Sequence, residues 1–213
     1  MPEKKPKVLN YDSVPILTGV QPDHYNSHLN NFEDRYDGKL FEKLDYVCSS
    51  LLDDKLEQRF IFLCGTPGCG KTHFLVGLFR ARAFKDGGLL GTEHSLYIQF
   101  PNLITEIIEG FSQSHSTRVG LLPYLTPKYL FVDDISKSEK MIDPNKMEYQ
   151  IFKDILLDRF ENKRLLVCTS NFTSIELKRM IKGTFGEYVL SRVESAGFFL
   201  DFPRIDFRRE KSK

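Results

Sequence analysis

Apolar residues recur along the chain in two alternating patterns. Short apolar runs of the kind found in buried strands occupy Arg59–Cys64, Ser95–Phe100, Tyr129–Asp134, Arg164–Ser170 and Phe198–Phe202. Between them, apolar residues return at helical spacing over 39–56, 71–84, 102–111, 147–159, 174–181 and 186–195. The Leu- and Pro-rich segment Gly120–Pro127 is expected to be a loop. Strands that alternate with helices predict an α/β fold with a five-stranded parallel sheet.

The two ends of the chain fall outside this pattern. The first twenty residues are largely polar and carry three prolines. We therefore expect an N-terminal arm over residues 1–24 that lies on the surface or is disordered. Residues 25–208 would form the core, and residues 209–213 a basic tail.

Composition narrows the class of protein. Hydrophobic residues make up 41% and charged residues 28% of the 213, which is typical of a soluble globular domain. The net charge of +1 gives no argument for nucleic-acid binding. The four cysteines form no CxxC pair, so a zinc site is not expected and a reducing cytoplasm fits best. No apolar run approaches the roughly 20 residues that span a bilayer, and no signal peptide is evident, so we expect no membrane contact.

The most specific motif follows the first predicted strand. Gly65-Thr-Pro-Gly-Cys-Gly-Lys-Thr72 matches the phosphate-binding P-loop, G-x-x-x-x-G-K-[ST], in full. Its glycines let backbone N–H groups approach phosphates, and the following helix directs its dipole at them. Lys71 would reach the β- and γ-phosphates, and the Thr72 hydroxyl would ligate Mg²⁺. A chance match is the alternative, but the preceding strand and following helix favour an ATP–Mg²⁺ site made of Gly65, Thr66, Pro67, Gly68, Cys69, Gly70, Lys71 and Thr72.

Two acids end the third strand. Asp133 and Asp134 follow the apolar run Tyr129–Val132, which we place beside the P-loop. We predict that Asp133 holds Mg²⁺ through water and that Asp134 orients or deprotonates the attacking water. A solvated polar strand end is the alternative, which the P-loop upstream disfavours.

Two further candidates are ambiguous when taken alone. Asn171 follows the fourth strand and would position water without adding charge, although Asn is also common in loops and caps. Arg192 lies in a late helix. It would be either an exposed helical arginine or an arginine finger that enters a neighbouring subunit's site.

In their order and spacing, these pieces resemble the AAA+ ATPases, above all the DnaC/DnaI helicase loaders and the IstB-type transposition ATPases. The resemblance spans about residues 25–208. It rests on the P-loop and its continuation into His73, and on Phe131-Val-Asp-Asp-Ile as Walker B. Weaker pieces are Asn31-Phe32, Leu157-Asp-Arg-Phe, Thr169-Ser-Asn171 as sensor 1, Ser191-Arg192 as the finger box, and Asp206-Phe-Arg208.

The resemblance implies more than the residues show alone. It implies a slow ATPase that acts as an ATP-dependent homo-oligomeric switch on DNA replication machinery, with Asp134, Asn171 and Arg192 catalytic and His73 part of the nucleotide site. A replicative helicase or a transposase would be the partner. Single-stranded DNA would be contacted by basic residues, for which the candidates are Lys137, Lys140, Lys146, Arg204, Arg208, Arg209, Lys211 and Lys213. We expect neither a folded helicase-gripping module before residue 25 nor a helical lid after the core.

Three other functions share the P-loop. A transposition ATPase has every motif named here. A small-molecule or nucleotide kinase would need an Arg-rich lid, and the stretch from Asn171 to Ser191 offers only Lys178, Arg179 and Lys182. A module that binds ATP without hydrolysing it also remains open. A GTPase is disfavoured because Asn162-Lys163-Arg164-Leu165 lacks the Asp of the guanine-specifying motif.

Overall fold

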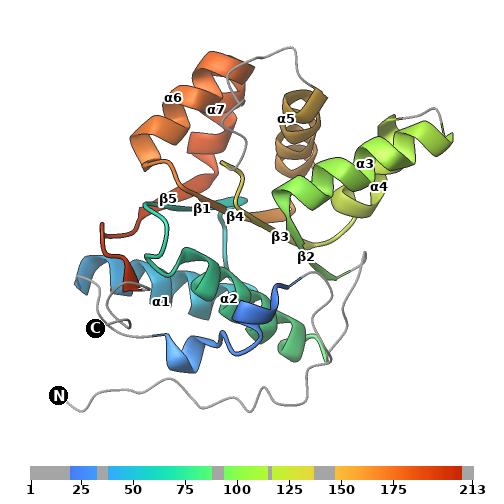
Figure 1. Cartoon of the computed structure of the whole chain (residues 1–213). Coiled ribbons are helices and arrows are strands. Elements are labelled where there is room, and N and C mark those ends of the chain that lie inside the picture. Colours follow the sequence, from blue (N-terminus) through green and yellow to red (C-terminus); the bar gives the residue numbers. More distant parts are fainter. Residues whose placement is uncertain (1–19, 33–37, 88–93, 115–116, 137–146, 208–213) are drawn as a thin grey trace.

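The chain folds around one parallel sheet (Figure 1). The computed structural model describes residues 20–32, 38–87, 94–114, 117–136 and 147–207. The strands lie in the order β2-β3-β4-β1-β5, and all four pairings are parallel. Their bounds are Phe60–Cys64 for β1, Ser95–Gln99 for β2, Tyr129–Asp133 for β3, Leu165–Ser170 for β4 and Gly197–Asp201 for β5. The predicted five-stranded α/β fold is confirmed.

The strand that carries the acid pair, β3, does not lie beside the P-loop strand β1, because β4 is inserted between them. Sequence order alone does not determine strand order, since each crossover helix can carry the chain past a neighbouring strand. The insertion places the residues that follow β4 between the P-loop and the acids.

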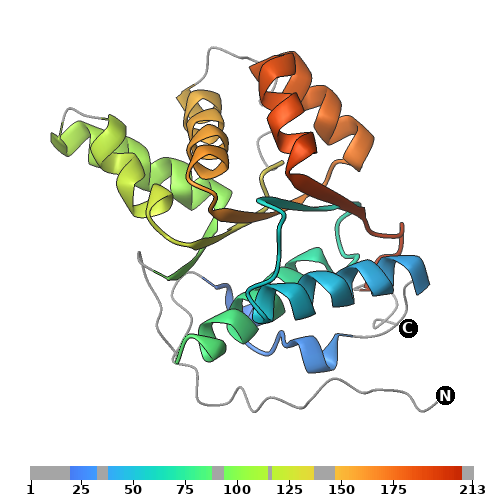
Figure 2. The same cartoon turned by 180° about the vertical axis from the view of Figure 1, so that it is seen from behind.

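Helices cover both faces of the sheet (Figures 1 and 2). On one face lie α1 (Gly38–Leu52) and α2 (Lys71–Lys85). On the other lie α3 (Phe100–Ser114), α4 (Thr117–Leu125), α5 (Met147–Glu161), α6 (Ser174–Phe185) and α7 (Glu187–Ser195). Two 3-10 turns, η1 (Pro22–His24) and η2 (Leu29–Asn31), pack near α2.

The alternation of strand side chains divides the core into two layers. Along β1, Phe60, Phe62 and Cys64 join the layer under α3 to α7. Ile61 and Leu63 join the layer under α1 and α2. Every residue of β1 is fully buried, as expected for a central parallel strand that is covered on both faces.

The expected loop Gly120–Pro127 is largely helical, so that prediction is wrong. Helix α4 runs through Leu125 and contains Pro123. It packs tightly against α3, because a Cβ on Gly120 would lie 2.9 Å from the Ile107 carbonyl oxygen. Leu121 and Tyr124, three residues apart, are buried there. This packing outweighs the helix-breaking tendency of Pro123.

A buried arginine ties α5 to the amino edge of the sheet. Arg159 has no exposed surface, and its guanidinium donates to the carbonyl oxygens of Leu165 at 3.0 Å, Tyr124 at 3.1 Å, Pro127 at 2.9 Å and Lys128 at 3.2 Å. Burial lowers the pKa of Arg159 to about 9, so the side chain stays charged at neutral pH.

No helix among the described residues is long and apolar enough to cross a membrane.

Candidate functional site

The P-loop joins β1 to α2 in a conformation that requires glycine. Gly65, Gly68 and Gly70 have φ values of 139°, 81° and 95°, which side chains rarely adopt. The Gly65 N–H donates to the carbonyl oxygens of Ser170 and Phe172, at 3.2 and 3.0 Å, so the loop is anchored to the end of β4. The loop leads directly into the N-terminus of α2, a site suited to anions.

The Lys71 side chain is held inside this loop. Its residue is only 6% exposed, and its Nζ donates to the carbonyl oxygens of Gly65 at 2.7 Å and Thr66 at 2.8 Å. Cys69 is fully buried within the same loop, and burial raises the pKa of its thiol. Pro67 is exposed on the outside.

A buried carboxylate joins the P-loop helix to the neighbouring strands. Asp133 is 4% exposed. Its Oδ1 accepts hydrogen bonds from Thr72 Oγ1 at 3.0 Å and from Thr169 Oγ1 at 2.6 Å. Its Oδ2 accepts one from the Tyr97 hydroxyl at 3.2 Å, and burial together with the Asp133 charge raises the pKa of that hydroxyl. The two predicted metal-site residues, Thr72 and Asp133, are therefore in direct contact.

The second acid is held in an unusual backbone conformation. Asp134 has a φ of 61°, in the left-handed region that few residues other than glycine adopt. Its N–H donates to Thr169 Oγ1 at 2.7 Å. Its Oδ1 accepts from Asn171 Nδ2 at 3.1 Å and from Ser136 Oγ at 3.4 Å. Two predicted catalytic residues, Asp134 and Asn171, thus meet at the carboxyl edge of the sheet.

Sequence reasoning quoted Thr169 within the sensor 1 piece but assigned no role to it, and it did not consider Ser136 or Tyr97. Thr169 contacts both acids, and Ser136 Oγ also accepts a hydrogen bond from the Asn171 N–H at 2.7 Å. Both lie within two residues of a motif position, which was an available signal. No sequence signal pointed to Tyr97, because only the pairing of β2 with β3 brings it to Asp133.

Comparisons with known proteins agree on the fold. No family model and no curated protein matches the chain. A crystal structure of the DnaC helicase loader has a TM-score of 0.65 at 17% identity and covers 86% of this chain and 100% of its own. A crystal structure of DnaI has a TM-score of 0.66 at 16% identity and covers 88% and 93%. The chain has the fold of the DnaC/DnaI-type AAA+ proteins.

A structure of DnaA is also similar to this chain. AMPPCP-bound DnaA from Aquifex aeolicus has a TM-score of 0.62 at 18% identity, and the chain spans about half of it, since 87% of this chain matches 54% of that one. The resemblance that the motifs carry is thereby confirmed at the level of the fold. Identities this low leave the activity and the partners to be argued from the site.

The structure does not place Arg192 at this site. Its guanidinium stacks 3.5 Å from the Tyr188 ring centroid and lies 5.5 Å from that of Phe160. Phe160 is near the end of α5, just before β4 begins, and α7 itself leads into the start of β5. Arg192 therefore lies toward the amino ends of the strands, whereas the P-loop follows the carboxyl end of β1.

His73 faces the segment upstream of α1. Its Nε2 lies 3.1 Å from the His28 carbonyl oxygen and 2.8 Å from Asn31 Oδ1, and its ring packs against Phe32 at 5.6 Å. Phe32 also contacts Phe74, with ring centroids 5.4 Å apart. These contacts fix the 28–32 segment along α2 beside the P-loop.

The C-terminal segment lies against the other side of the loop. The Phe207 N–H donates to the Gly68 carbonyl oxygen at 3.1 Å. The Asp206 carboxylate sits so close that a Cβ on Gly68 would lie 2.1 Å from its Oδ1. Of the basic residues predicted to contact DNA, Arg204 is exposed in this segment. The others, Lys137, Lys140, Lys146, Arg208, Arg209, Lys211 and Lys213, lie outside the described residues.

Proposed function

We propose that this chain binds ATP with Mg²⁺ and hydrolyses it slowly, as an AAA+ switch of the helicase-loader type with its ATPase core over residues 25–208. One observation carries the proposal: the P-loop lysine, the Thr72–Asp133 contact and the Asp134–Asn171 contact converge at one edge of the sheet. The similar DnaA structure is AMPPCP-bound, which supports nucleotide binding.

Phosphate binding would use the loop as it stands. The ammonium of Lys71 holds two loop carbonyls at 2.7 and 2.8 Å, and phosphate oxygens would replace these neutral acceptors with charged ones. The N–H groups at the start of α2 would face the same anion. Gly65 through Thr72 are thus the groups we assign to the triphosphate, with His73 acting through the segment 28–32.

The Thr72–Asp133 contact fits a hard cation. A hydroxyl and a carboxylate oxygen 3.0 Å apart are donors of the kind that Mg²⁺ prefers. Mg²⁺ at this place would supply positive charge beside the phosphates. Thr169 and Tyr97 orient the Asp133 carboxylate toward Thr72.

Asp134 is the residue we assign to proton transfer. Its carboxylate is ordered by the Asn171 amide, which adds no charge and leaves the carboxylate able to accept a proton from water. Because P-loop proteins without an engaged arginine hydrolyse slowly, we expect basal turnover below about 1 s⁻¹.

Phosphate release by purified protein tests this assignment. Asp134→Asn should bind ATP as the wild type does and lose turnover by at least about a hundredfold, which is the range for a general base. Asp154→Asn, which changes a carboxylate on α5, is the matched control and should turn over normally. Unchanged hydrolysis in Asp134→Asn would remove Asp134 from the mechanism.

Arg192 would complete the site of a neighbouring copy. Because it lies toward the amino ends of the strands, it reaches a phosphate only in another subunit, as an arginine finger does. Light scattering should therefore show ATP-dependent assembly in the wild type and in Arg179→Ala, a matched exposed arginine on α6, and loss of assembly in Arg192→Ala. A wild type that stays monomeric with ATP–Mg²⁺ and single-stranded DNA would contradict the switch.

The similarity to a structure named as a helicase loader supports the choice of partner. We infer a replicative helicase, with single-stranded DNA held by basic residues such as Arg204. Pull-down of a replicative helicase by the ATP-bound oligomer is the expected result. Selective capture of a transposase would assign the chain to transposition instead.

A further inference from the structure

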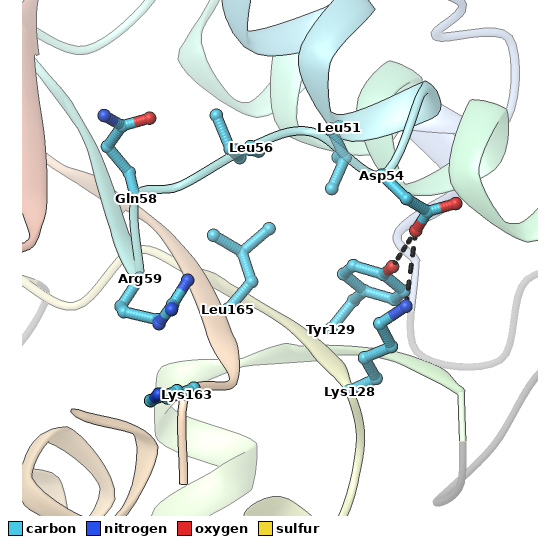
Figure 3. A pocket seen from close by; sticks show the side chains of 9 residues that line it. All are labelled: Leu51, Asp54, Leu56, Gln58, Arg59, Lys128, Tyr129, Lys163 and Leu165. Atoms are coloured by element: carbon cyan, nitrogen blue, oxygen red, sulfur yellow. Dashed lines mark hydrogen bonds and ion pairs between the residues drawn. The ribbon is translucent and has the colours of Figure 1, made fainter. Parts of the chain in front are cut away.

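A polar hollow lies at the edge of the sheet opposite the P-loop. It has a volume of about 170 Å³ and opens between the end of α1 and the starts of β1, β3 and β4 (Figure 3). Leu51, Leu56 and Leu165 form its apolar part. Figure 3 shows Arg59 and Lys163 on one side of Leu165, with Lys128 and Asp54 on the other.

The charges around the hollow do not cancel. The Asp54 carboxylate is already engaged by Arg82 at 2.9 Å, Lys128 at 3.3 Å and the Tyr129 hydroxyl at 2.6 Å. In the part of the chain that the structure describes, Arg59 and Lys163 have no carboxylate partner, and Arg59 donates only to the Glu57 carbonyl oxygen at 2.8 Å. Two positive side chains therefore face the hollow without compensation.

Backbone conformation singles out the same place. Three described residues other than glycine have a left-handed backbone: Asp134 in the ATP site, and Asp54 and Lys163, with φ values of 57° and 54°. Asp54 and Lys163 follow the ends of α1 and α5, where glycine is the usual residue because it adopts this conformation freely. Both side chains line the hollow. This conformation caps the two helices and holds both residues at the hollow.

We propose that this hollow binds a phosphomonoester group. Such a group carries a charge of about −1.5 to −2, which matches the two uncompensated cations, and the guanidinium of Arg59 suits its oxygens. The volume is well below the roughly 300 Å³ at which pockets begin to enclose whole small molecules, so the hollow takes the phosphate and not an attached base.

Gln58 also lines the hollow, but its Oε1 is enclosed by protein, so a ligand in the hollow would not bond to that oxygen. Inorganic phosphate and the 5′-terminal phosphate of a nucleic-acid strand share the required chemistry, and the test separates them.

Calorimetric titration with inorganic phosphate tests the site, and Lys163→Gly is the decisive variant. Glycine removes the ammonium and relieves the left-handed backbone, so the variant should gain about 2 to 4 °C in Tm. It should also bind phosphate at least about tenfold more weakly, because a charge-assisted hydrogen bond is lost. A merely structural lysine would give the first result without the second.

Two controls isolate the hollow from the P-loop. Lys71→Ala and Lys182→Ala should retain phosphate binding at the hollow, and Arg59→Gln should weaken it. Binding of a 5′-phosphorylated oligothymidylate is then compared with binding of the same strand ending in a 5′-hydroxyl. Tighter binding of the phosphorylated strand identifies the ligand as the end of a nucleic-acid strand, and equal binding of the two strands identifies it as free phosphate. No saturable phosphate binding in the wild type, equal affinity in Lys163→Gly, or complete loss in Lys71→Ala would overturn the proposal. Because Lys71→Ala is included, the result does not depend on ATP binding.

Discussion

Replacing Thr169 by valine removes one hydroxyl that serves both acids of the site. Thr169 Oγ1 donates to the Asp133 carboxylate at 2.6 Å and accepts the Asp134 N–H at 2.7 Å, and the residue is 1% exposed. Valine has nearly the same shape, so the substitution creates no cavity. It leaves a buried carboxylate oxygen short of one donor and an N–H without its acceptor.

The size of the effect follows from these two bonds. A hydrogen bond to a charged group contributes about 1.5–3 kcal/mol, and an unsatisfied buried N–H costs about 1–3 kcal/mol. The Asp133 carboxylate keeps its hydrogen bonds from Thr72 and Tyr97. We therefore expect Thr169→Val to lower the free energy of unfolding by about 3 kcal/mol. Thr169→Ser keeps the hydroxyl and removes one methyl group, which costs about 1 kcal/mol.

Urea unfolding and phosphate release measure the two consequences. Thr169→Val should unfold at clearly lower urea than Thr169→Ser, and it should need more Mg²⁺ to reach half of its maximal turnover, because Asp133 and Asp134 lose their common support. Thr169→Ser should show the Mg²⁺ dependence of the wild type. Equal unfolding midpoints and an equal Mg²⁺ dependence for the two variants would refute the organising role of the hydroxyl.

Three further predictions concern other parts of the fold. Arg159→Met should lower the free energy of unfolding by about 4 kcal/mol in urea, because four carbonyl oxygens lose a buried donor; a loss below about 1 kcal/mol would show that water satisfies them. The Tyr129 hydroxyl, Lys128 and Arg82 lower the pKa of Asp54 although burial opposes them, so its stabilisation is present above the unfolded pKa of about 4 and is lost as pH falls below it. Since its side chain is 42% exposed, we expect Asp54→Asn to cost only about 1 kcal/mol at pH 7, and the difference from wild type to vanish in acid; a constant difference would contradict this. Burial raises the pKa of Cys64 to about 12 and also raises those of Cys69 and Cys168, so iodoacetamide should label these thiols far more slowly in native than in unfolded protein, as mass spectrometry can measure; rapid native labelling of Cys69 would indicate an open P-loop.

The sequence predicted the sheet well because its strands are buried on both faces. A fully buried strand such as β1 leaves a continuous apolar run, which is visible without knowledge of its neighbours. The P-loop was visible for a related reason, since its function constrains residue types at fixed spacing within one segment. Asp134 and Asn171 were proposed from their places at strand ends, and the structure brings the two side chains into contact.

The missed features depend on contacts between distant segments. Helix α4 contains Pro123 and forms because Gly120 lets it approach α3, which no local pattern reveals. Tyr97 reaches Asp133 only through strand pairing. Arg159 looks like an ordinary polar position on a helix, yet it is fully buried because the carbonyls around it come from α4, the α4–β3 connection and β4.

Calorimetric titration of the purified protein with ATP in the presence of Mg²⁺ tests the central claim most directly, with Lys71→Ala and the surface variant Lys182→Ala in parallel. The site predicts saturable binding with one ATP per chain in the wild type and in Lys182→Ala. It also predicts a loss of at least about tenfold in affinity in Lys71→Ala, because a buried ammonium that would bind phosphate oxygens is removed. Equal affinity in wild type and Lys71→Ala, or no ATP binding by the wild type, would contradict the assignment of this edge of the sheet as an ATP site.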